Sequence, residues 1–128
     1  MNIQTFAERY TAAWCSRDAR AVAAFFSPGG SLTINEGEPA QGRAAIAKVA
    51  RSFMDAFPDL NVAMDGVEGY EGKVIYKWTL TGTNTGPGGS GRPVRISGFE
   101  EWQLSDDDLI AESRGHFDAA DYERQLEP

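Results

Sequence analysis

The sequence has little of what disulfides and metal sites require. It contains one cysteine and one histidine, Cys15 and His116, in 128 residues. A lone cysteine excludes an internal disulfide and a thiolate metal cluster. A metal bound beside a lone histidine would need mostly carboxylate ligands. We therefore expect no metal site.

Long apolar runs and excess positive charge are also missing. No apolar run approaches the roughly 20 residues of a membrane span. Residues 1–6 resemble the start of an amphipathic helix and not a signal peptide, so we expect a cytoplasmic protein with no membrane contact. The formal net charge is −7, which repels phosphate backbones and argues against a nucleic-acid partner.

No motif of a phosphate-binding loop occurs. Residues 82–91 are rich in glycine but lack the strand–loop–helix order and the lysine of such a loop. The sequence therefore gives no sign of a loop that would hold a nucleotide phosphate. The sequence has no internal repeat and no low-complexity tract, and its length suits one domain spanning residues 1–128.

The first half of the sequence predicts helices. Apolar residues recur at three- and four-residue steps over residues 3–14 and again over 46–57, and Pro58 ends the second pattern. Asp18 is a suitable N-cap for a short helix between them, which residues 27–30 would stop. The inner face of that short helix is expected to carry Val22, Phe25 and Phe26. A short strand over residues 31–35 and a polar loop over 36–42 are expected next.

The second half of the sequence predicts a sheet. Apolar and polar residues alternate in runs rich in β-branched and aromatic side chains, separated by polar or glycine-rich turns. The predicted strands are residues 60–65, 74–81, 94–104 and 109–117. A helix over residues 118–126, capped by Asp118, would close the chain. Helices followed by hairpin-connected strands predict an α+β fold, with a curved antiparallel sheet wrapped over the helices.

One acid departs from this alternation. The residues that share a face over 94–104 are Val94, Ile96, Gly98, Glu100, Trp102 and Leu104. All except Glu100 are apolar or glycine. A carboxylate on a core-facing register is costly unless it is paired, protonated or facing a cavity. Glu100 is therefore the first candidate functional residue, the alternative being a structural ion pair with Arg92, Arg95 or Arg114.

A second candidate site lies on the last predicted strand. His116 and Asp118 are two positions apart, so they share a face if the strand stays extended. An imidazole beside a carboxylate can form an acid/base pair. Alternatively, Asp118 only caps the last helix. If Ser113, Gly115 and Phe117 face the pocket, the pair faces away and is not catalytic, and the sequence leaves this choice open.

Six short motifs follow one another along the chain. They are Tyr-Thr-Ala-Ala-Trp at 10–14, Gly-Arg-Ala-Ala-Ile at 42–46, Ala-Phe-Pro-Asp-Leu at 56–60, Trp-Thr-Leu-Thr-Gly-Thr-Asn-Thr-Gly at 78–86, Gly-Arg-Pro-Val at 91–94, and the segment 117–126. In order and spacing the sequence resembles the SnoaL-like branch of the nuclear-transport-factor-two-like superfamily, over nearly the whole chain. This resemblance implies a cone, in which a curved antiparallel sheet and helices enclose a pocket.

The resemblance also implies roles for single residues. Tyr10 matches the tyrosine of ketosteroid isomerase that donates to the substrate oxygen, and Glu100 falls where that enzyme has a protonated acid. The general base of that enzyme would fall near residues 34–35, where no carboxylate stands. The remaining candidates for the base are Asp118, His116, Glu36 and Glu38. Asn84 takes the place of a histidine common in the family, and Arg114 that of a tryptophan.

The expected substrate contacts are mostly aromatic. They are Trp14, Phe53, Trp78, Trp102 and Phe117, together with Asn84. For Tyr10 and Trp14 the alternative is simple packing of the first helix. The resemblance implies a small cofactor-free enzyme that isomerises, cyclises or dehydrates an apolar carbonyl compound. The alternative is a binding or dimerisation module without catalysis. Ile75 and Phe99, opposite the main apolar set, predict a homodimer through the outer face of the sheet.

Overall fold

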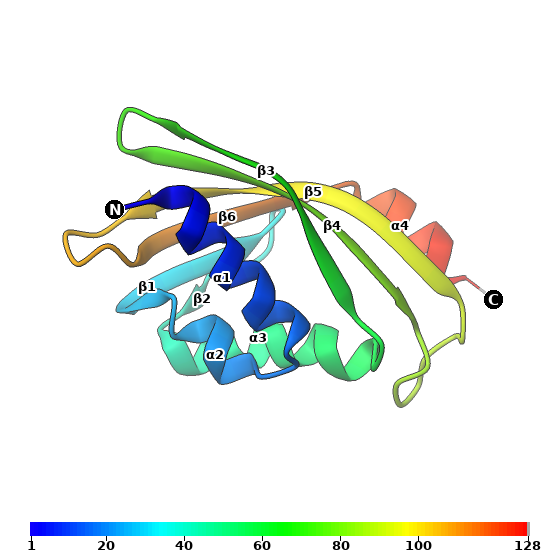
Figure 1. Cartoon of the computed structure of the whole chain (residues 1–128). Helices are drawn as coiled ribbons and strands as arrows, with labels where there is room; N and C mark the ends of the chain where they lie inside the picture. Colours follow the sequence, from blue (N-terminus) through cyan, green and yellow to red (C-terminus); the bar gives the residue numbers. More distant parts are fainter. Residues whose placement is uncertain (128) are drawn as a thin grey trace.

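A curved sheet covers a group of three helices in the computed structural model, which describes residues 1–127 (Figure 1). The helices are α1 (Ile3–Cys15), α2 (Ala19–Ala23), α3 (Arg43–Ala56) and, at the end of the chain, α4 (Ala119–Leu126). The strands are β1 (Phe26–Ile34), β2 (Ala40–Gln41), β3 (Asn61–Tyr70), β4 (Lys73–Thr83), β5 (Pro93–Leu104) and β6 (Ile110–Phe117). This is the α+β order that the sequence predicts.

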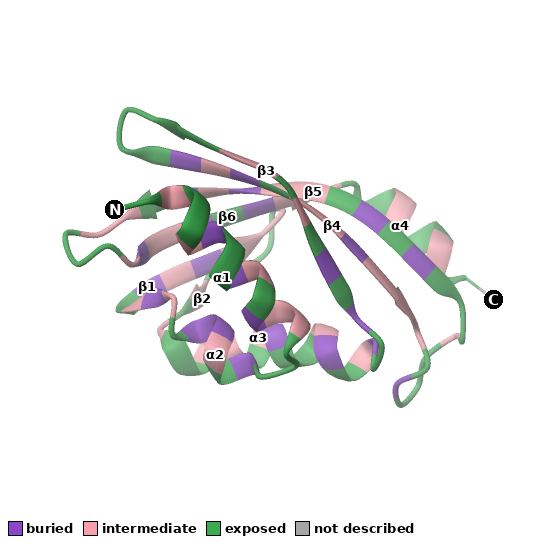
Figure 2. Ribbon diagram, viewed as in Figure 1, coloured by how far each residue is buried: buried purple, intermediate pink, exposed green. Residues whose placement is uncertain are grey.

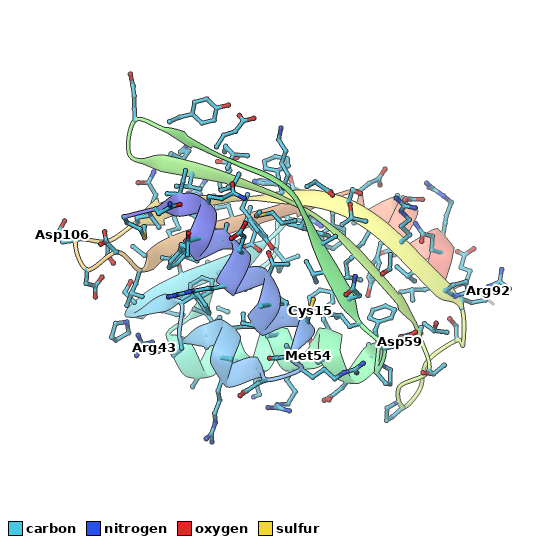
Figure 3. All side chains as sticks on the ribbon, in the orientation of Figure 1. Cys15, Arg43, Met54, Asp59, Arg92 and Asp106 are labelled. Carbon is cyan, nitrogen blue, oxygen red and sulfur yellow. The ribbon has the colours of Figure 1, made fainter. Side chains whose placement is uncertain are left out.

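The six strands form one open sheet in the order β2-β1-β6-β5-β4-β3. The strands from β3 to β6 are antiparallel neighbours, as expected for hairpins, whereas β1 joins β6 in parallel. The loop before Arg92 and the turn that contains Asp106 lie at opposite ends of β5 (Figure 3). In the middle of the sheet, Tyr76 lies opposite Glu100, and Trp78 lies opposite Gly98.

The start of β1 differs from the sequence prediction. The helix α2 ends at Ala23, so Phe25 and Phe26 do not lie on it, and residues 27–30 belong to the strand instead of stopping the helix. The backbone N–H of Ile110 donates to the carbonyl of Phe25 at 2.9 Å, so pairing with β6 begins here. Pro28 is accommodated because the pairing of β1 with β6 is irregular between Phe26 and Ser31.

The segment predicted as a polar loop over residues 36–42 also contains a short strand. Ala40 and Gln41 form β2, which pairs with Leu32 and Ser31 of β1. The predicted caps are confirmed: Asp18 accepts hydrogen bonds from the first turn of α2, and Asp118 accepts one from the backbone N–H of Asp121 at 3.0 Å. No helix in residues 1–127 has the length and apolar character needed to cross a bilayer.

The core consists of two clusters of buried side chains, and Figure 2 colours the buried positions of the ribbon purple. The larger cluster joins α1, α2 and α3 to the inner face of the sheet, and the smaller lies beneath the other end of β4 and β5, around Phe57 and Leu80. Trp14 and Trp78 pack against both clusters. The two tryptophans therefore lie at the boundary between the two clusters, and a cavity that both of them line is found there.

Candidate functional site

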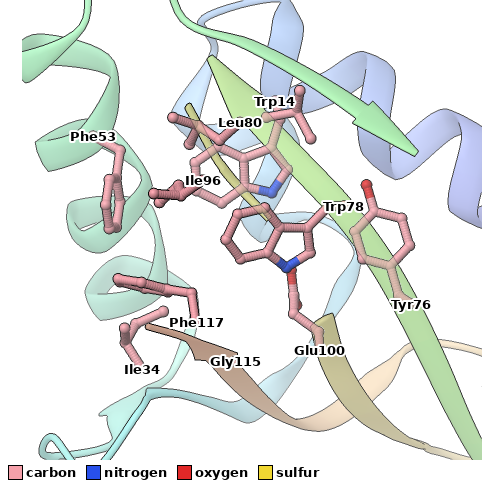
Figure 4. Close-up of a pocket in the computed structure, with 11 residues that line it drawn as sticks. Trp14, Ile34, Phe53, Tyr76, Trp78, Leu80, Ile96, Glu100, Gly115 and Phe117 are labelled. Carbon is pink, nitrogen blue, oxygen red and sulfur yellow. The ribbon is translucent and has the colours of Figure 1, made fainter. Parts of the chain in front are cut away.

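A cavity of about 50 Å³ lies between the helices and the inner face of the sheet (Figure 4). Its lining residues are Trp14, Ile34, Phe53, Val62, Tyr76, Trp78, Leu80, Ile96, Glu100, Gly115 and Phe117. Within residues 1–127, Glu100 supplies the only carboxyl group of this lining. We call this space the Glu100 cavity. It is an apolar space with one acid in its wall.

The Glu100 carboxyl group is held by three side-chain donors. Ser113 Oγ donates to Oε1 at 2.7 Å, and Trp102 Nε1 donates to the same oxygen at 3.0 Å. The Tyr10 hydroxyl lies 3.0 Å from Oε1 and 3.2 Å from Oε2. Oε1 is therefore surrounded by donors, whereas Oε2 has only Tyr10. If the group carries a proton, Oε2 is the oxygen with room for it.

Burial controls the acidity of this group. Glu100 is only 7% exposed, and desolvation raises its pKa above the ordinary glutamate value, against the opposing effect of the hydrogen bonds from Ser113, Trp102 and Tyr10. No arginine or lysine of the described chain forms an ion pair with it. Glu100 therefore faces a cavity and contacts Tyr10, and the alternative of a structural ion pair with Arg92, Arg95 or Arg114 has no counterpart among the described residues.

Tyr10 itself does not line the cavity. Its ring is fully buried and packs edge-on against Trp102, with ring centroids 5.1 Å apart. Its hydroxyl is directed at Glu100, and burial followed by the Glu100 charge raises the pKa of the tyrosine. The expectation that Tyr10 contacts a ligand oxygen directly therefore has no geometric support. Tyr10 is placed to position Glu100.

Four of the six predicted substrate contacts line the cavity: Trp14, Phe53, Trp78 and Phe117. Trp102 lies deeper, beneath α1, where it donates to Glu100 and stacks on Tyr76 at 4.9 Å. Asn84 lies in the loop after β4, where its amide donates to the carbonyl of Ala56 at 3.1 Å and accepts from the backbone of Ser90 at 2.8 Å. Asn84 therefore organises a loop and does not reach the cavity.

Trp78 lines the cavity together with Glu100. Its ring lies over Gly98, where an added Cβ would come within 2.7 Å of Trp78 Cζ2. Figure 4 shows the indole nitrogen on the same side as the Glu100 carboxyl group. Among the hydrogen bonds of the described residues, none involves this N–H, whereas the N–H of Trp102 is used by Glu100. Trp78 is thus a donor available to a ligand.

His116 and Asp118 lie outside the Glu100 cavity. The His116 ring stacks on Phe99 with centroids 4.7 Å apart, and its Nε2 lies 3.4 Å from Glu101 Oε1. Asp118 caps α4. Together with Asn35 and Glu36, the two residues line a separate open depression on the other side of Phe117. Glu38 is exposed in the segment between β1 and β2. None of the proposed bases therefore borders the Glu100 cavity.

Two residues that the sequence did not single out complete the site. Ser113 is fully buried and lies opposite Trp102 in the pairing of β5 with β6. Tyr76 lines the cavity, and its hydroxyl lies 2.5 Å from Thr11 Oγ1. Of the two alternatives that the sequence leaves open for β6, the structure has the one in which Ser113, Gly115 and Phe117 face inward: Gly115 and Phe117 line the cavity, and Ser113 donates to Glu100. Its role as a donor depends on strand register, which no local pattern provides.

The fold and the cavity have counterparts among solved structures. A protein from Catenulispora acidiphila with a ketosteroid isomerase-like fold, solved in complex with trimethylamine, is 14% identical with a TM-score of 0.83, over 94% of this chain and 91% of that one. A protein from Jannaschia sp. CCS1, described as a SnoaL-like polyketide cyclase, is 19% identical with a TM-score of 0.78, over 98% of this chain and 94% of that one. AclR from Streptomyces galilaeus, described as a hydroxylase, is 22% identical with a TM-score of 0.80, over 96% and 83%.

These likenesses support the fold, and the sequence itself supports the family. No curated protein matches this chain. The family model described as SnoaL-like polyketide cyclase matches residues 4–126, which include all of the helices and strands described above except Ile3, the first residue of α1. The protein therefore belongs to the SnoaL-like polyketide cyclase family.

Proposed function

We propose that this protein is a cofactor-free enzyme in which Glu100 exchanges a proton with a small, mostly apolar carbonyl compound. The observation that carries the proposal is one buried carboxyl group in an otherwise apolar cavity, oriented by three side chains. A carboxyl group with a raised pKa can donate to a ligand oxygen when protonated. When ionised, it accepts a proton more readily than an exposed acid does.

A single carboxyl group is sufficient for the reaction classes expected from the family. Isomerisation removes a proton from one carbon and returns it to another. Intramolecular aldol cyclisation removes a proton from carbon and gives it to the new alkoxide. Dehydration gives a proton to the leaving hydroxyl, and the resulting carboxylate then takes one from the neighbouring carbon as water departs. In each case Glu100 ends in the protonation state in which it began, so no second base is required.

Trp78 provides a second contact to the ligand. Its unused indole N–H faces the same cavity as Glu100 and is suited to hold the carbonyl oxygen while negative charge develops on it. The surrounding apolar walls, which include Trp14, Phe53 and Phe117, would exclude water and strengthen both hydrogen bonds. Tyr10, Trp102 and Ser113 would act as positioning residues through Glu100.

The size of the cavity limits the ligand. Its volume of about 50 Å³ compares with the roughly 10–15 Å³ that one water molecule requires. A compound of a few heavy atoms, or only the reacting end of a larger one, fits this space. A substrate of polyketide size would require wall side chains such as Phe53 and Phe117 to rotate away.

The test uses two small substrates whose products absorb in the ultraviolet: cyclohex-3-en-1-one, which isomerises to the conjugated enone, and 4-hydroxybutan-2-one, which dehydrates. Glu100→Gln is expected to lower the enzymatic rate about 10²- to 10⁴-fold, and Trp78→Phe about 100-fold. Glu101→Gln, one residue away on the outer face, is the matched control and should keep the wild-type rate. Wild-type turnover by Glu100→Gln, or no turnover of either compound by the wild type, would rule against the proposal.

A non-catalytic site for a small alkylammonium ion is the second candidate. Five aromatic side chains line the cavity around Glu100: Trp14, Phe53, Tyr76, Trp78 and Phe117. Aromatic faces attract such cations, and an ionised Glu100 would supply the counter-charge. Trimethylamine is bound in the similar structure from Catenulispora acidiphila.

Protonation distinguishes the two candidates. A neutral ketone gains a hydrogen bond from Glu100 only while that group is protonated, so binding of cyclohexanone should weaken as pH rises through the pKa of Glu100, although proton abstraction itself uses the ionised form. An ammonium ligand needs Glu100 ionised, so binding of trimethylammonium should tighten over the same interval. Titration of tryptophan fluorescence between pH 5 and pH 9 with each probe measures both trends, and Glu100→Gln should abolish both.

A further inference from the structure

A second concave surface lies between α2 and α3, separate from the Glu100 cavity. It has a volume of about 850 Å³ and lies at the start of α3, near Arg43 in Figure 3. Its lining consists of Arg20, Ala23, Ala24, Arg43, Ala44, Ala45, Ala47, Lys48 and Arg51. We call it the basic groove, because four of its nine residues are cationic and none is acidic.

The charge of this groove contrasts with that of the chain. The net charge is −7, yet four of the 12 lysine and arginine residues gather here. No ion pair among the described residues involves any of these four side chains. The positive potential of the groove is therefore not neutralised by neighbouring carboxylates. Surfaces of this kind steer and orient partners of opposite charge.

The shape of the groove suits a helix. Five alanines form its lining between the cations, so the backbone of an incoming helix, about 10 Å across with its side chains, can approach α2 and α3 closely. Arg43 is anchored, because its Nε donates to the carbonyl of Phe26 at 2.9 Å. Arg20, Lys48 and Arg51 are exposed and can reach carboxylates on either flank of a helix lying between them.

We propose that the basic groove docks an acidic helix of a partner protein. A small anion is disfavoured, because the cations of the groove are exposed and spread over two helices. A flat anionic membrane would touch only the rims of a concave surface. Nucleic acid is also disfavoured, because its dense negative charge would be repelled by the rest of a chain whose net charge is −7. A helix with carboxylates along one face would direct its negative charge at the groove and not at the rest of the protein surface, so it is the partner that fits best. This proposal is independent of the chemistry at Glu100.

The test measures binding of a fluorescein-labelled 18-residue helical peptide that carries glutamates along one face. Fluorescence anisotropy is recorded at 25 mM and 300 mM NaCl, with a control peptide that has glutamine in place of glutamate. Lys48→Glu/Arg51→Glu is compared with Arg92→Glu/Arg95→Glu, an exposed pair that makes the same change in net charge at the far end of the sheet. The groove variant should bind the peptide at least about tenfold more weakly, and the control variant less than about twofold.

Amide chemical shifts of the wild-type protein give a second readout. On titration with the glutamate peptide, shifts should change along α2 and the first half of α3 and stay constant near Glu100. Three results would each overturn the proposal. They are equal binding of the glutamate and glutamine peptides, equal loss of binding in both charge-reversal variants, and tighter binding of a 20-base-pair DNA duplex or phosphatidylserine vesicles than of the peptide.

Discussion

The two faces of the central sheet place neighbouring acids of β5 in different surroundings. On the inner face, Glu100 is buried and accepts hydrogen bonds from Tyr10, Trp102 and Ser113. On the outer face, Glu101 is partly exposed. Its Oε2 lies 3.7 Å from Lys73 Nζ, and its Oε1 lies 3.4 Å from His116 Nε2. A shift of one residue in register would exchange these surroundings. The position on the strand therefore decides whether a carboxyl group becomes an acid with a raised pKa or a partner in weak surface ion pairs.

Close packing of the inner face gives the largest expected effect. A Cβ at Gly98 would lie 2.2 Å from the carbonyl oxygen of His116 and 2.7 Å from Trp78. Gly98→Ala should therefore lower the free energy of unfolding by about 3 kcal/mol, as measured by urea denaturation. Gly29→Ala, where no atom lies within 4 Å of the added Cβ, is the control and should change it by less than about 0.5 kcal/mol. Equal effects at both positions would contradict the difference in packing.

The outer face is the expected dimer interface, and Phe99 tests it. Phe99 and Ile75 are half-buried apolar residues on this face. Phe99→Glu should raise the dissociation constant of the dimer about 100-fold, because a charge would replace an apolar contact. Sedimentation velocity at micromolar concentration gives the measurement, with Thr85→Glu in an exposed loop as the control. A monomeric wild type would contradict the expectation.

Two tyrosines, one buried and one exposed, allow the contribution of a buried hydroxyl to the free energy of unfolding to be measured. Tyr10→Phe removes a donor to the buried Glu100 and should lower the free energy of unfolding by about 1–2 kcal/mol. The hydroxyl of Tyr70, which is 55% exposed, donates to Glu68 at the surface. Tyr70→Phe should cost less than about 0.5 kcal/mol. Thermal unfolding of both variants measures the difference, and a cost at Tyr10 no larger than that at Tyr70 would show that the Tyr10–Glu100 contact adds little.

The smallest effect concerns the pH dependence of stability. Because burial raises the pKa of folded Glu100 above its unfolded value, the folded state holds its proton over a pH range where the unfolded state has lost it. Wild-type stability should therefore fall as pH rises from the unfolded pKa to the folded pKa, and then level off. Glu100→Gln lacks this penalty, so its stability relative to wild type should be greater at pH 8 than at pH 4.

Glu101→Gln is the control for that measurement. It alters only surface ion pairs and should change the free energy of unfolding by less than about 0.5 kcal/mol at either pH. Guanidinium denaturation at pH 4 and pH 8 provides the comparison. A Glu100→Gln variant that is less stable relative to wild type at pH 8 than at pH 4 would show that hydrogen bonding outweighs burial at this carboxyl group.

Local patterns were sufficient to predict much of the fold and the central residue of the site. Period-two alternation placed Glu100 on the inner face, and helical spacing together with the caps located α1, α3 and α4. Alternation predicted Trp78 and Trp102 alike as substrate contacts, because they lie on adjacent strands and both face the inner side of the sheet. Only the curvature of the sheet and the position of α1 decide that Trp78 borders the cavity and Trp102 lies beneath the helix.

The remaining features depend on contacts between distant parts of the chain. The start of β1 is fixed by its pairing with β6, which lies more than 80 positions away along the chain. Proline and glycine in residues 27–30 predict a loop locally, and this pairing overrides that preference. The orientation of His116 likewise follows from the register of β5 with β6, in which it lies opposite Phe99.

The unequal surroundings of the two Glu100 oxygens have a stereochemical consequence. Because Oε1 is occupied by three donors and Oε2 by one, a proton would leave and return through the same oxygen, on one face of a bound compound. Hydrogen removed from one carbon would then be added to another on the same face. In a pocket that excludes bulk water, part of that hydrogen would be the atom originally removed, so a product formed in D₂O would retain protium.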